Sequence, residues 1–594
     1  MTDLATSLPP GLLQDVHATG ALSWGDVHVA QKVAHLYGES DQMVHLALAL
    51  SVRVLRAGSI CLSLGTAAAS VELDEDTVEI PAALWPEPER WRASVSASPM
   101  VSVGADGPGD RPLRLVGDLL YLERYWQEES TVAAELRARR SRPPEDLDVA
   151  RLRAARAELL SIGTDADQAV AAVMPALAQV TVVAGGPGTG KTHTLARLLG
   201  VLWRTLPTPP LVALAAPTGK AAVRMHEALG DALTELPSDL GNELGRLRAT
   251  TIHRLLGWVP ESRNRFQHSR TNPLPHDLVV VDEASMISVT LMARLLDALR
   301  PQTRLVLVGD PDQLAPVEAG AVLADIVDAD RPSATINALL RDLGLRESGP
   351  VVRLQHNHRS VPEIADVAGA VLAGDEDQVV GLLGSGAVRL AATPDDTDLR
   401  RRVIDSGRAM IAAARRGDAA SALGQLELHR ILCAHRRGPH GVSFWSRQVE
   451  EWLVDSVEGF DPTPTWYPGR PLLVTENSPD LGLYNGDAGV VVNDGDQLRA
   501  YFARGRSEWM SVSPFLLEGV HTIHAMTVHK AQGSQFDAVT LVLPNPDSPL
   551  LTRELLYTAI TRARTEVTLI GSEAALRAAV RRQAQRASGL RGRL

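Results

Sequence analysis

A glycine-rich segment in the first third of the sequence has the composition of a phosphate-binding loop. It fits the pattern G-x-x-x-x-G-K-[ST] and consists of Gly185, Gly186, Pro187, Gly188, Thr189, Gly190, Lys191 and Thr192. Glycines let successive backbone N–H groups point at phosphate oxygens, and a helix that follows adds partial positive charge. We expect Lys191 to reach the β- and γ-phosphates of a nucleoside triphosphate, and the Thr192 hydroxyl to bind Mg²⁺.

Two neighbouring carboxylates follow a later apolar run. Asp282 and Glu283 come directly after Leu278–Val281. Asp282 is suited to hold Mg²⁺, directly or through water, and Glu283 is suited to activate a water molecule as general base. An Asp-Glu pair after a strand is also common as a helix N-cap, but the phosphate loop upstream favours the catalytic interpretation. The two motifs together predict Mg²⁺-dependent triphosphate hydrolysis and leave open what it drives.

The elements that must position these residues are short apolar runs, each followed by a Gly- or Pro-containing turn and a helical pattern. The first set is Val180–Ala184, Leu211–Ala216, Leu278–Val281 and Leu305–Val308. Continuous apolarity is typical of parallel strands buried on both faces, so this set predicts a doubly wound α/β domain. A second set predicts a second such domain: Arg430–Ala434, Pro471–Val474, Ala538–Leu543 and Val567–Ile570.

Gln313 lies in the block GDPDQLAPV, after the last strand of the first set. An amide at the carboxyl end of a strand beside the phosphate loop is placed to sense the γ-phosphate and relay its loss. We therefore add Gln313 to the candidate catalytic residues.

Length and composition limit the class of protein. A chain of 594 residues is too long for one hydrophobic core and predicts two to four domains. Its net charge of −12 argues against coating nucleic acid by bulk attraction, so any such contact must follow a local track. With two cysteines, and with no apolar stretch of the ~20 residues that span a bilayer, we expect a cytoplasmic protein without membrane contact.

Lysine is rare, since only four of the 59 basic residues are lysines. Three of the four lie in motifs, namely Lys191, Lys220 and Lys530. A surviving lysine in an arginine-rich chain marks positions where a compact ammonium is needed.

Further blocks follow one another along the chain: APTGKAA from Ala216, TTIHRLL from Thr250, RLQHNHRS from Arg353, AMTVHKAQGSQFD from Ala525 and LLYTAITRAR from Leu555. With the phosphate loop, these blocks resemble the ordered motif set of superfamily 1 helicases. The sequences of three blocks, AMTVHKAQGSQFD, GDPDQLAPV and LLYTAITRAR, are most similar to those of the RecD family, the alpha subunits of bacterial exodeoxyribonuclease V (RecBCD). The resemblance runs from about Gln168 to Gly571.

This resemblance implies two RecA-like P-loop lobes with ATP between them and single-stranded DNA across their top. It implies that Gln168 reads the adenine, and that Arg359 and Arg562 reach the γ-phosphate from the second lobe, Arg562 in the manner of an arginine finger. Gly533 and Gln535 lie in the block that holds the ribose. At the position of Gln535 the family usually has Glu. An amide still hydrogen-bonds a hydroxyl, so we expect hydrolysis with looser nucleotide selectivity.

The resemblance also implies a DNA track, whose hydroxyl and basic side chains suit phosphate. Its predicted members are Thr218, Lys220, Thr250, His253, Thr527, His529 and Lys530. An aromatic side chain that stacks on bases is expected in such a track, with Phe444, Trp445 and Tyr467 as candidates. The alternative is a core position, which is the more common place for an aromatic in a chain with 4% aromatic residues.

We expect three domains, beginning with a mainly helical partner-docking domain at 1–140. The first lobe is predicted at 141–350 with a small β-hairpin (1B) at about 257–276, and the second at 351–594 with an SH3-like insert (2B) at about 466–519. The Arg-rich stretch Leu576–Arg593 is interpreted as a helix with a solvated face, with a DNA-binding arm as the alternative.

The function implied is that of an ATP-dependent 5′→3′ DNA helicase subunit. It would belong to a RecBCD-type helicase–nuclease that processes double-strand DNA ends for recombinational repair, with RecB-like and RecC-like partners and the nuclease in a partner. The alternatives are a stand-alone superfamily 1B helicase and a regulatory ATPase that gates a partner nuclease.

Overall fold

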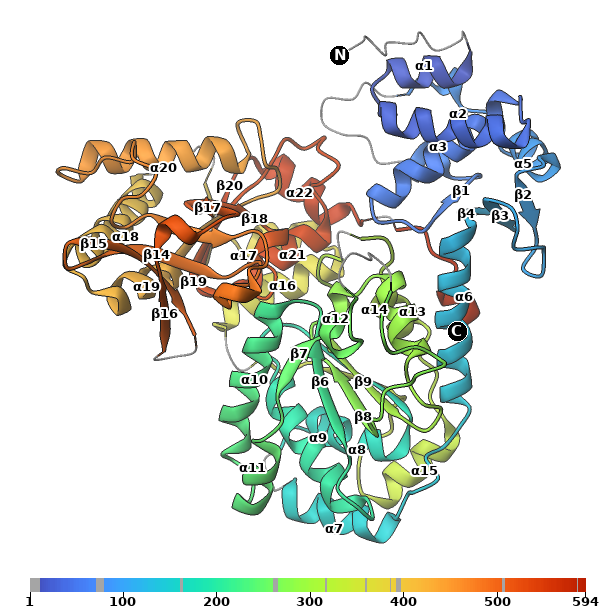
Figure 1. Cartoon of the computed structure of the whole chain (residues 1–594), viewed down its shortest axis with the longest axis horizontal. Helices are drawn as coiled ribbons and strands as arrows, with labels where there is room; N and C mark the ends of the chain where they lie inside the picture. Colours follow the sequence, from blue (N-terminus) through green and yellow to red (C-terminus); the bar gives the residue numbers. More distant parts are fainter. Residues whose placement is uncertain are drawn as a thin grey trace.

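The computed structural model shows two α/β lobes, a β-sheet insert and an amino-terminal region (Figure 1). It describes residues 11–70, 80–160, 164–259, 265–315, 318–357, 360–384, 386–391, 397–504, 508–584 and 586–594. No helix in these ranges is long and apolar enough to cross a membrane.

The amino-terminal region combines helices with a small sheet. The helices are α1 (Leu12–Ala18), α2 (Trp24–Tyr37), α3 (Gln42–Arg56), α4 (Ala67–Ser70), the 3-10 turn η1 (Ala82–Leu84) and α5 (Pro88–Ala97). The sheet has the order β1-β4-β3-β2, with β1 (Cys61–Ser63), β2 (Val101–Val103), β3 (Leu113–Val116) and β4 (Leu119–Leu122). This sheet was not predicted, because strands of three or four residues are too short to show an alternating pattern.

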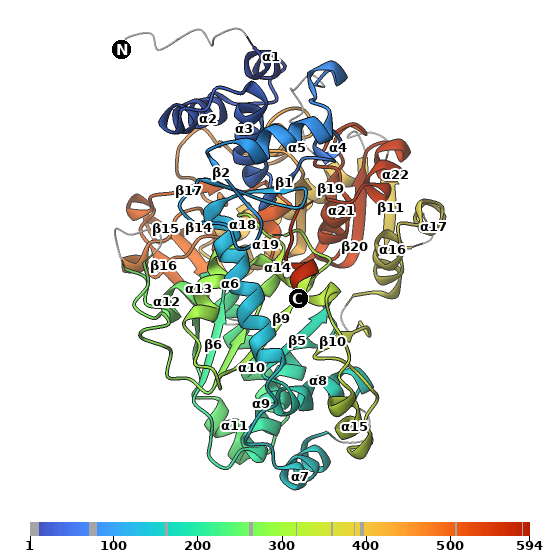
Figure 2. The same cartoon turned by 90° about the vertical axis from the view of Figure 1, so that its right-hand side faces the viewer.

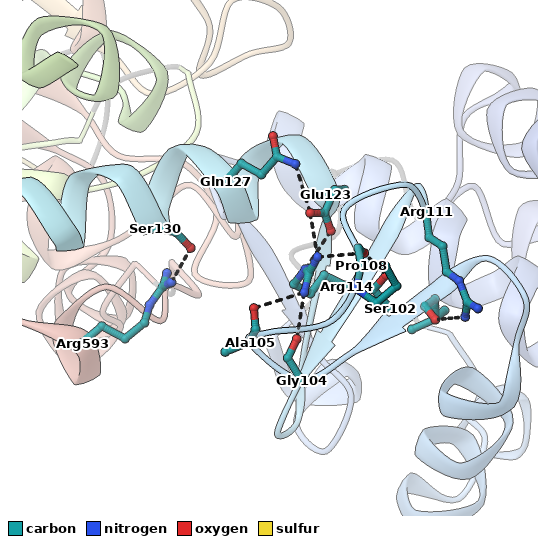
Figure 3. A network of polar contacts seen from close by, with 11 residues as sticks. Ser102, Gly104, Ala105, Pro108, Arg111, Arg114, Glu123, Gln127, Ser130 and Arg593 are labelled. Carbon is teal, nitrogen blue, oxygen red and sulfur yellow. Dashed lines mark hydrogen bonds and ion pairs between the residues drawn. The ribbon is translucent and has the colours of Figure 1, made fainter. Parts of the chain in front are cut away.

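The long helix α6 (Glu123–Arg140) joins the amino-terminal region to the first lobe (Figure 2). At its start, the Arg114 guanidinium of β3 donates to both oxygens of Glu123 at 2.8 and 2.9 Å, and to the carbonyls of Gly104 and Ala105 (Figure 3). Further along, Trp126 and other apolar residues of α6 belong to the core of the first lobe. Helix α6 was predicted to belong to the domain at 1–140, but it shares its core with the first lobe.

The first lobe is built on a six-stranded parallel sheet with the order β10-β5-β9-β8-β6-β7. Its strands are β5 (Val180–Gly185), β6 (Val212–Ala216), β7 (Ala249–Thr251), β8 (Leu278–Val281), β9 (Arg304–Gly309) and β10 (Val351–Leu354). The central strands are almost wholly buried, because helices cover both faces of a parallel sheet. The four predicted strands are therefore confirmed.

The helices of the first lobe are α7 (Val149–Leu159), α8 (Ala166–Leu177), α9 (Lys191–Thr205), α10 (Gly219–Leu233), α11 (Ser238–Leu244), α12 (Ile252–Leu255), η2 (Ala284–Met286), α13 (Val289–Asp297), α14 (Val322–Asp328) and α15 (Ala334–Asp342). The predicted boundary at 350/351 is wrong, because β10 pairs in parallel with β5 and completes the first sheet. The sequence of a strand at a domain boundary does not show which of the two sheets the strand joins.

The second lobe has a five-stranded parallel sheet with the order β11-β20-β19-β12-β18. Its strands are β11 (Val388–Ala391), β12 (His429–Cys433), β18 (Ala525–Thr527), β19 (Phe536–Val542) and β20 (Ala563–Ile570). The helices around it are α16 (Pro362–Ala373), α17 (Glu376–Leu382), α18 (Thr397–Arg415), α19 (Ala419–Leu428), α20 (Val442–Ser456), η5 (His529–Ala531), α21 (Arg553–Ile560) and α22 (Glu573–Arg581).

A five-stranded antiparallel sheet interrupts the second lobe, in the order β16-β15-β14-β13-β17. Its elements are β13 (Pro471–Val474), η3 (Pro479–Leu481), β14 (Ala488–Asp494), β15 (Gln497–Ala503), β16 (Trp509–Val512), η4 (Pro514–Leu516) and β17 (Val520–Thr522). The assignment of Pro471–Val474 to the second α/β sheet is corrected here, since it pairs only with antiparallel neighbours. All four of its residues are buried, and such a run does not reveal the direction of its partners.

The predicted hairpin at about 257–276 is described in part. Antiparallel bridges join Trp258 to Phe266 and Ser269 to Asn272, while residues 260–264 lie outside the described ranges. The hairpin stays a prediction.

The carboxyl-terminal tail, residues 586–594, leaves the second lobe after α22 and ends beside α6 in both views (Figures 1 and 2). The Ile60 amide donates to the Ala587 carbonyl at 3.1 Å, and Leu590 is buried in the core of the first lobe. The predicted solvated helix Leu576–Arg593 is therefore wrong beyond Arg581. The tail contains a short 3-10 turn, η6 (Arg591–Arg593), and contacts α6, where Arg593 pairs with Glu129.

Candidate nucleotide and DNA site

The phosphate loop runs from the end of β5 into α9. Gly188 and Gly190 have φ angles of +85° and +79°, which favour glycine over every other residue. The Lys191 ammonium donates to the carbonyls of Gly185 and Gly186 at 2.7 and 2.9 Å. The loop therefore curls around the ammonium, where phosphate oxygens are able to replace the two carbonyls.

The two carboxylates of the site lie at the end of β8. Glu283 has a φ of +50°, the only positive value for a non-glycine residue within the described ranges, and its amide donates to Asp282 at 2.8 Å. Backbone strain of this kind concentrates at functional sites. Burial, and next the Glu283 carboxylate, raise the pKa of Asp282 to about 6, while Lys191 acts in the opposite direction.

The surroundings of Asp282 fit a cation, because they leave its negative charge without full compensation. Thr192 and Asp282 offer a hydroxyl and a carboxylate, the hard oxygen ligands that Mg²⁺ uses together with phosphate oxygens.

Arg562 faces this site from the second lobe. Its side chain is buried, its Nε donates to the Thr558 carbonyl at 3.1 Å, and its Nη1 donates to the Ser534 carbonyl at 3.4 Å. Its Nη2 has no hydrogen-bond partner among the described residues. Burial lowers the pKa of Arg562, while Glu283 and Asp310 act to raise it. A buried, oriented guanidinium whose Nη2 is not already hydrogen-bonded is able to stabilise negative charge that develops in the cleft.

Gln313 lies between the lobes. Its Nε2 donates to Asp310 Oδ2 at 2.9 Å, and the same carboxylate oxygen accepts from the Tyr557 hydroxyl at 3.0 Å. Tyr557 and Asp310 were not chosen from the sequence, although both stand inside the motif blocks. Arg224 of α10 was missed as well, and its charge faces Glu283.

The predicted adenine and ribose residues lie around the loop. Gln168 accepts from Arg197 at 2.9 Å and donates to the Thr189 carbonyl at 3.4 Å, so both ends of its amide already bind protein atoms. Gln535 and Pro187 line a pocket between the lobes. Gly533 has a φ of +68°. Arg359 lies outside the described residues.

The predicted DNA residues follow β6, β7 and β18. Thr218 and Thr527 accept from the amides of Ala221 and Lys530 at 3.2 and 3.3 Å, so both hydroxyls stabilise local turns. Thr250 is partly exposed and His253 is exposed. Burial, and next Arg586 and Arg436, lower the pKa of His529 to about 4, so this ring is neutral at pH 7. Lys530 is exposed.

Lys220 already binds two protein groups. Its ammonium donates to the Gly486 carbonyl of the insert at 3.0 Å and to the Ser534 hydroxyl at 2.7 Å. Beside it, a Cβ on Gly219 would lie 2.7 Å from Cγ of Tyr484. The insert is therefore packed directly on the predicted track.

Two of the three stacking candidates are wrong. Trp445 and Tyr467 are 1% and 6% exposed and belong to the core between α20 and the second sheet, whereas Phe444 is 43% exposed. Consecutive residues of a helix point about 100° apart, so one can be buried while the other stays exposed. The sequence did not show which of Phe444 and Trp445 enters the core.

The order of the first sheet separates the two groups of residues. The phosphate loop, Asp282 and Gln313 follow the adjacent strands β5, β8 and β9, while the predicted DNA residues of this lobe follow the outer strands β6 and β7. Ligands of parallel sheets bind at the carboxyl ends of strands, so nucleotide and track would meet the same edge at different places.

Comparisons with known proteins match family models to three parts of the chain. The chain matches the family models for an AAA domain at 167–319, a UvrD-like helicase C-terminal domain at 522–570, and the RecBCD enzyme subunit RecD, N-terminal domain, at 18–121.

Curated relatives match over nearly the whole chain. The RecBCD enzyme subunit RecD of Mycolicibacterium smegmatis is 47% identical, covering 96% of this chain and 97% of that protein. The one from Mycobacterium tuberculosis is 46% identical, covering 98% and 97%. The ATP-dependent RecD2 DNA helicase of Deinococcus radiodurans is 30% identical, covering 83% of this chain but 60% of that protein. The chain belongs to the family of RecD subunits of the RecBCD enzyme.

Proposed function

We propose that this chain is the ATP-hydrolysing 5′→3′ DNA helicase subunit of a RecBCD-type helicase–nuclease. The observation that carries the proposal is the meeting of two half-sites: Lys191, Asp282 and Glu283 from the first lobe face Arg562 from the second. A site divided between two lobes lets ATP hydrolysis open and close the cleft. The greater identity to RecD subunits, 47% against 30% for the RecD2 helicase, favours this role over that of a stand-alone helicase.

Each side chain has a separate task in the proposed reaction. Glu283 polarises the attacking water, and Lys191 and Arg562 place positive charge beside the transferred phosphoryl group. Thr192 and Asp282 hold Mg²⁺, which when bound offsets negative charge on the phosphate oxygens. Gln313 senses the γ-phosphate, as does Arg359 by family resemblance. Gln168 contacts the adenine once one of its present bonds opens, and Gln535 contacts the ribose.

The DNA track follows from the same resemblance. Lys530, His253 and Thr250 are exposed enough to meet the strand directly, while Thr218, Thr527 and His529 line the track through their turns. Phe444 remains the stacking candidate. The hairpin at about 257–276 and the SH3-like insert guide the separated strands.

The amino-terminal region is proposed to dock on a RecC-like subunit, with a RecB-like subunit completing a heterotrimer in the cytoplasm. Helix α2 supplies a docking face, because Val29 and Leu36, seven residues apart and so on one side of the helix, are 44% and 69% exposed. An exposed apolar surface of this kind marks a protein–protein contact. The nuclease is assigned to a partner.

The test is strand separation by the purified chain, alone and with its partner subunits. The substrates are duplexes with a 5′ or a 3′ single-stranded tail, and Lys191→Gln is the control. Unwinding of the 5′-tailed duplex alone, lost in Lys191→Gln, supports the proposal. Unwinding only from the 3′ tail contradicts the polarity. ATP hydrolysis without unwinding in the complex supports a regulatory ATPase instead.

A further inference from the structure

The segment Asp310–Leu314, which follows β9, is held by the second lobe at both of its ends. The Tyr557 hydroxyl of α21 donates to Asp310 Oδ2 at 3.0 Å. At the other end, the Leu314 amide donates to the Thr558 hydroxyl at 2.8 Å, and Gln532 Nε2 donates to the Leu314 carbonyl at 2.6 Å. Gln313 lies between these anchors, so its surroundings depend on how the two lobes meet.

Asp310 links Tyr557 to Gln313. Its Oδ2 accepts from both side chains, at 3.0 Å from the tyrosine and 2.9 Å from the amide, and its Oδ1 accepts from the Asp312 amide at 3.1 Å. All three linked side chains are buried, with exposures of 1% for Asp310, 6% for Gln313 and 5% for Tyr557. A hydrogen bond to a buried carboxylate is stronger and more directional than a neutral one. Loss of the tyrosine donor therefore loosens Asp310 and, through Asp310, the Gln313 amide.

The tyrosine hydroxyl also lies against the phosphate loop. A Cβ on Gly186 would lie 2.7 Å from this oxygen, and the Gly186 carbonyl accepts from Lys191 at 2.9 Å. Burial, and next Asp310, raise the pKa of Tyr557 well above its usual value, so the hydroxyl keeps its proton and acts as a donor. Arg562 lies two residues beyond the end of α21, and its Nε donates to the Thr558 carbonyl of that helix, so Tyr557 and Arg562 enter the cleft together.

We propose that Tyr557 is a positioning residue for ATP hydrolysis. Its hydroxyl fixes Asp310, and Asp310 orients the Gln313 amide, only when the lobes are closed. Arrival of Arg562 and alignment of Gln313 are thereby one event, and hydrolysis in an open cleft is suppressed. This inference rests on the ATPase activity proposed above.

The test compares Tyr557→Phe with wild type in ATP hydrolysis stimulated by single-stranded DNA, using the full chain alone or in its complex. We expect kcat to fall about 10- to 100-fold, the effect of one hydrogen bond to a charged group, with KM for ATP changed less than about threefold. The matched control is Tyr121→Phe, whose hydroxyl donates to the buried Glu129 at 3.2 Å beside the tail. It removes the same kind of bond and leaves kcat unchanged.

A double variant tests the connection to Gln313. Because Tyr557 acts through that amide, Tyr557→Phe combined with Gln313→Ala lowers kcat no further than Gln313→Ala alone. Asp310→Asn, which removes the charge that both donors share, gives a similar loss and serves if Tyr557→Phe does not fold.

Three results overturn the inference: an unchanged kcat in Tyr557→Phe, an equal loss in Tyr121→Phe, or multiplicative losses in the double variant. Failure of the proposed function is distinct. In that case wild type and Lys191→Gln hydrolyse ATP equally slowly, and the inference falls with it.

Discussion

Asp282 and Asp310 are two carboxylates held where their charged forms are disfavoured. Burial is the main cause of the raised pKa of each, and Lys191 acts against it in both. Lys191 is thus the principal positive charge that the first lobe supplies to the site. Arg224 of the same lobe faces Glu283, and Arg562 adds its charge from across the cleft, so the activity of the site depends on lobe closure.

At this scale we predict that Arg562→Ala lowers kcat for ATP hydrolysis by about 10³-fold, the effect of removing an arginine finger. Arg562→Lys restores little of it, because the guanidinium uses Nε and Nη1 to bind two carbonyls while leaving Nη2 free for phosphate. Steady-state hydrolysis with saturating single-stranded DNA measures this. Arg577→Ala is the matched control, since this arginine of α22 pairs with Glu573 at 2.8 Å and does not line the pocket between the lobes. A full rescue by lysine would contradict the assigned geometry.

At the scale of the elements, the tail and α6 form a buried polar contact that the sequence does not predict. Glu129 is fully buried and accepts from the Tyr121 hydroxyl, the Ser588 hydroxyl and the Gly589 amide, and it pairs with Arg593. The Arg593 guanidinium also lies 4.2 Å from the Trp126 ring and donates to Ser130 (Figure 3). The tail therefore ties the second lobe to α6.

We predict that Arg593→Met destabilises this contact by about 3–5 kcal/mol, because it leaves the Glu129 charge buried without its partner. Thermal melting of the full chain measures the loss. Glu129→Gln in the Arg593→Met background recovers most of it by removing the stranded charge. Arg591→Ala is the control, since its exposed pair with Asp328 contributes about 0–1 kcal/mol. Equal losses in the two arginine variants would refute the buried-pair explanation.

The turn after β6 and the insert meet at Lys220. Burial, and next Arg224, lower the pKa of Lys220 to about 7, while Asp487 and Glu427 raise it and Arg430 adds to the lowering. An exposed lysine titrates near 10.4, so the open or unfolded state binds more protons between about pH 7 and 10. The contact between lobe and insert therefore gains stability as pH rises through this window.

We predict that the melting temperature of wild type minus that of Lys220→Met increases between pH 7 and pH 9. Using the difference removes the contributions of other titrating groups. A difference that stays constant would show that the ammonium remains charged in the folded state. A falling difference would reverse the sign of the linkage.

At the scale of the whole molecule, the two lobes and the proposed docking face lie at different places. The apolar residues of α2 are exposed in the amino-terminal region, whereas the nucleotide residues lie between the two lobes (Figure 1). The amino-terminal region contacts the first lobe through α6, through the tail, and through the Gly320 amide, which donates to the Gly58 carbonyl at 2.9 Å. Assembly and hydrolysis should therefore respond to different substitutions.

We predict that Val29→Asp with Leu36→Asp abolishes co-purification with a RecC-like subunit and leaves ATP hydrolysis by the isolated chain unchanged. A charge on each residue prevents burial of the face. Val454→Asp, a change at a similarly exposed apolar residue of α20, is the control and retains assembly. Retained co-purification of the double variant would place the docking face elsewhere.

Local pattern alone predicted the phosphate loop, the carboxylates after β8 and most parallel strands, because each depends on neighbours in the chain. The loop needs its glycines in fixed order, and a strand buried on both faces must be continuously apolar. The pairing of β13 and the boundary at β10 were mistaken, since strand partners are chosen between segments far apart in sequence.

Only the tertiary structure decided which aromatics are buried, where the tail docks, and that Tyr557 reaches Asp310. Those two residues are 247 positions apart, and their hydrogen bond exists because two separately folded lobes close on one another. Lys220 gives the same lesson: the sequence marked it as unusual among arginines, but its partners in the insert come from packing. Sequence determined the chemistry that each lobe carries, and the fit between lobes determined which groups act together, because contacts across a cleft leave no periodic trace in the chain.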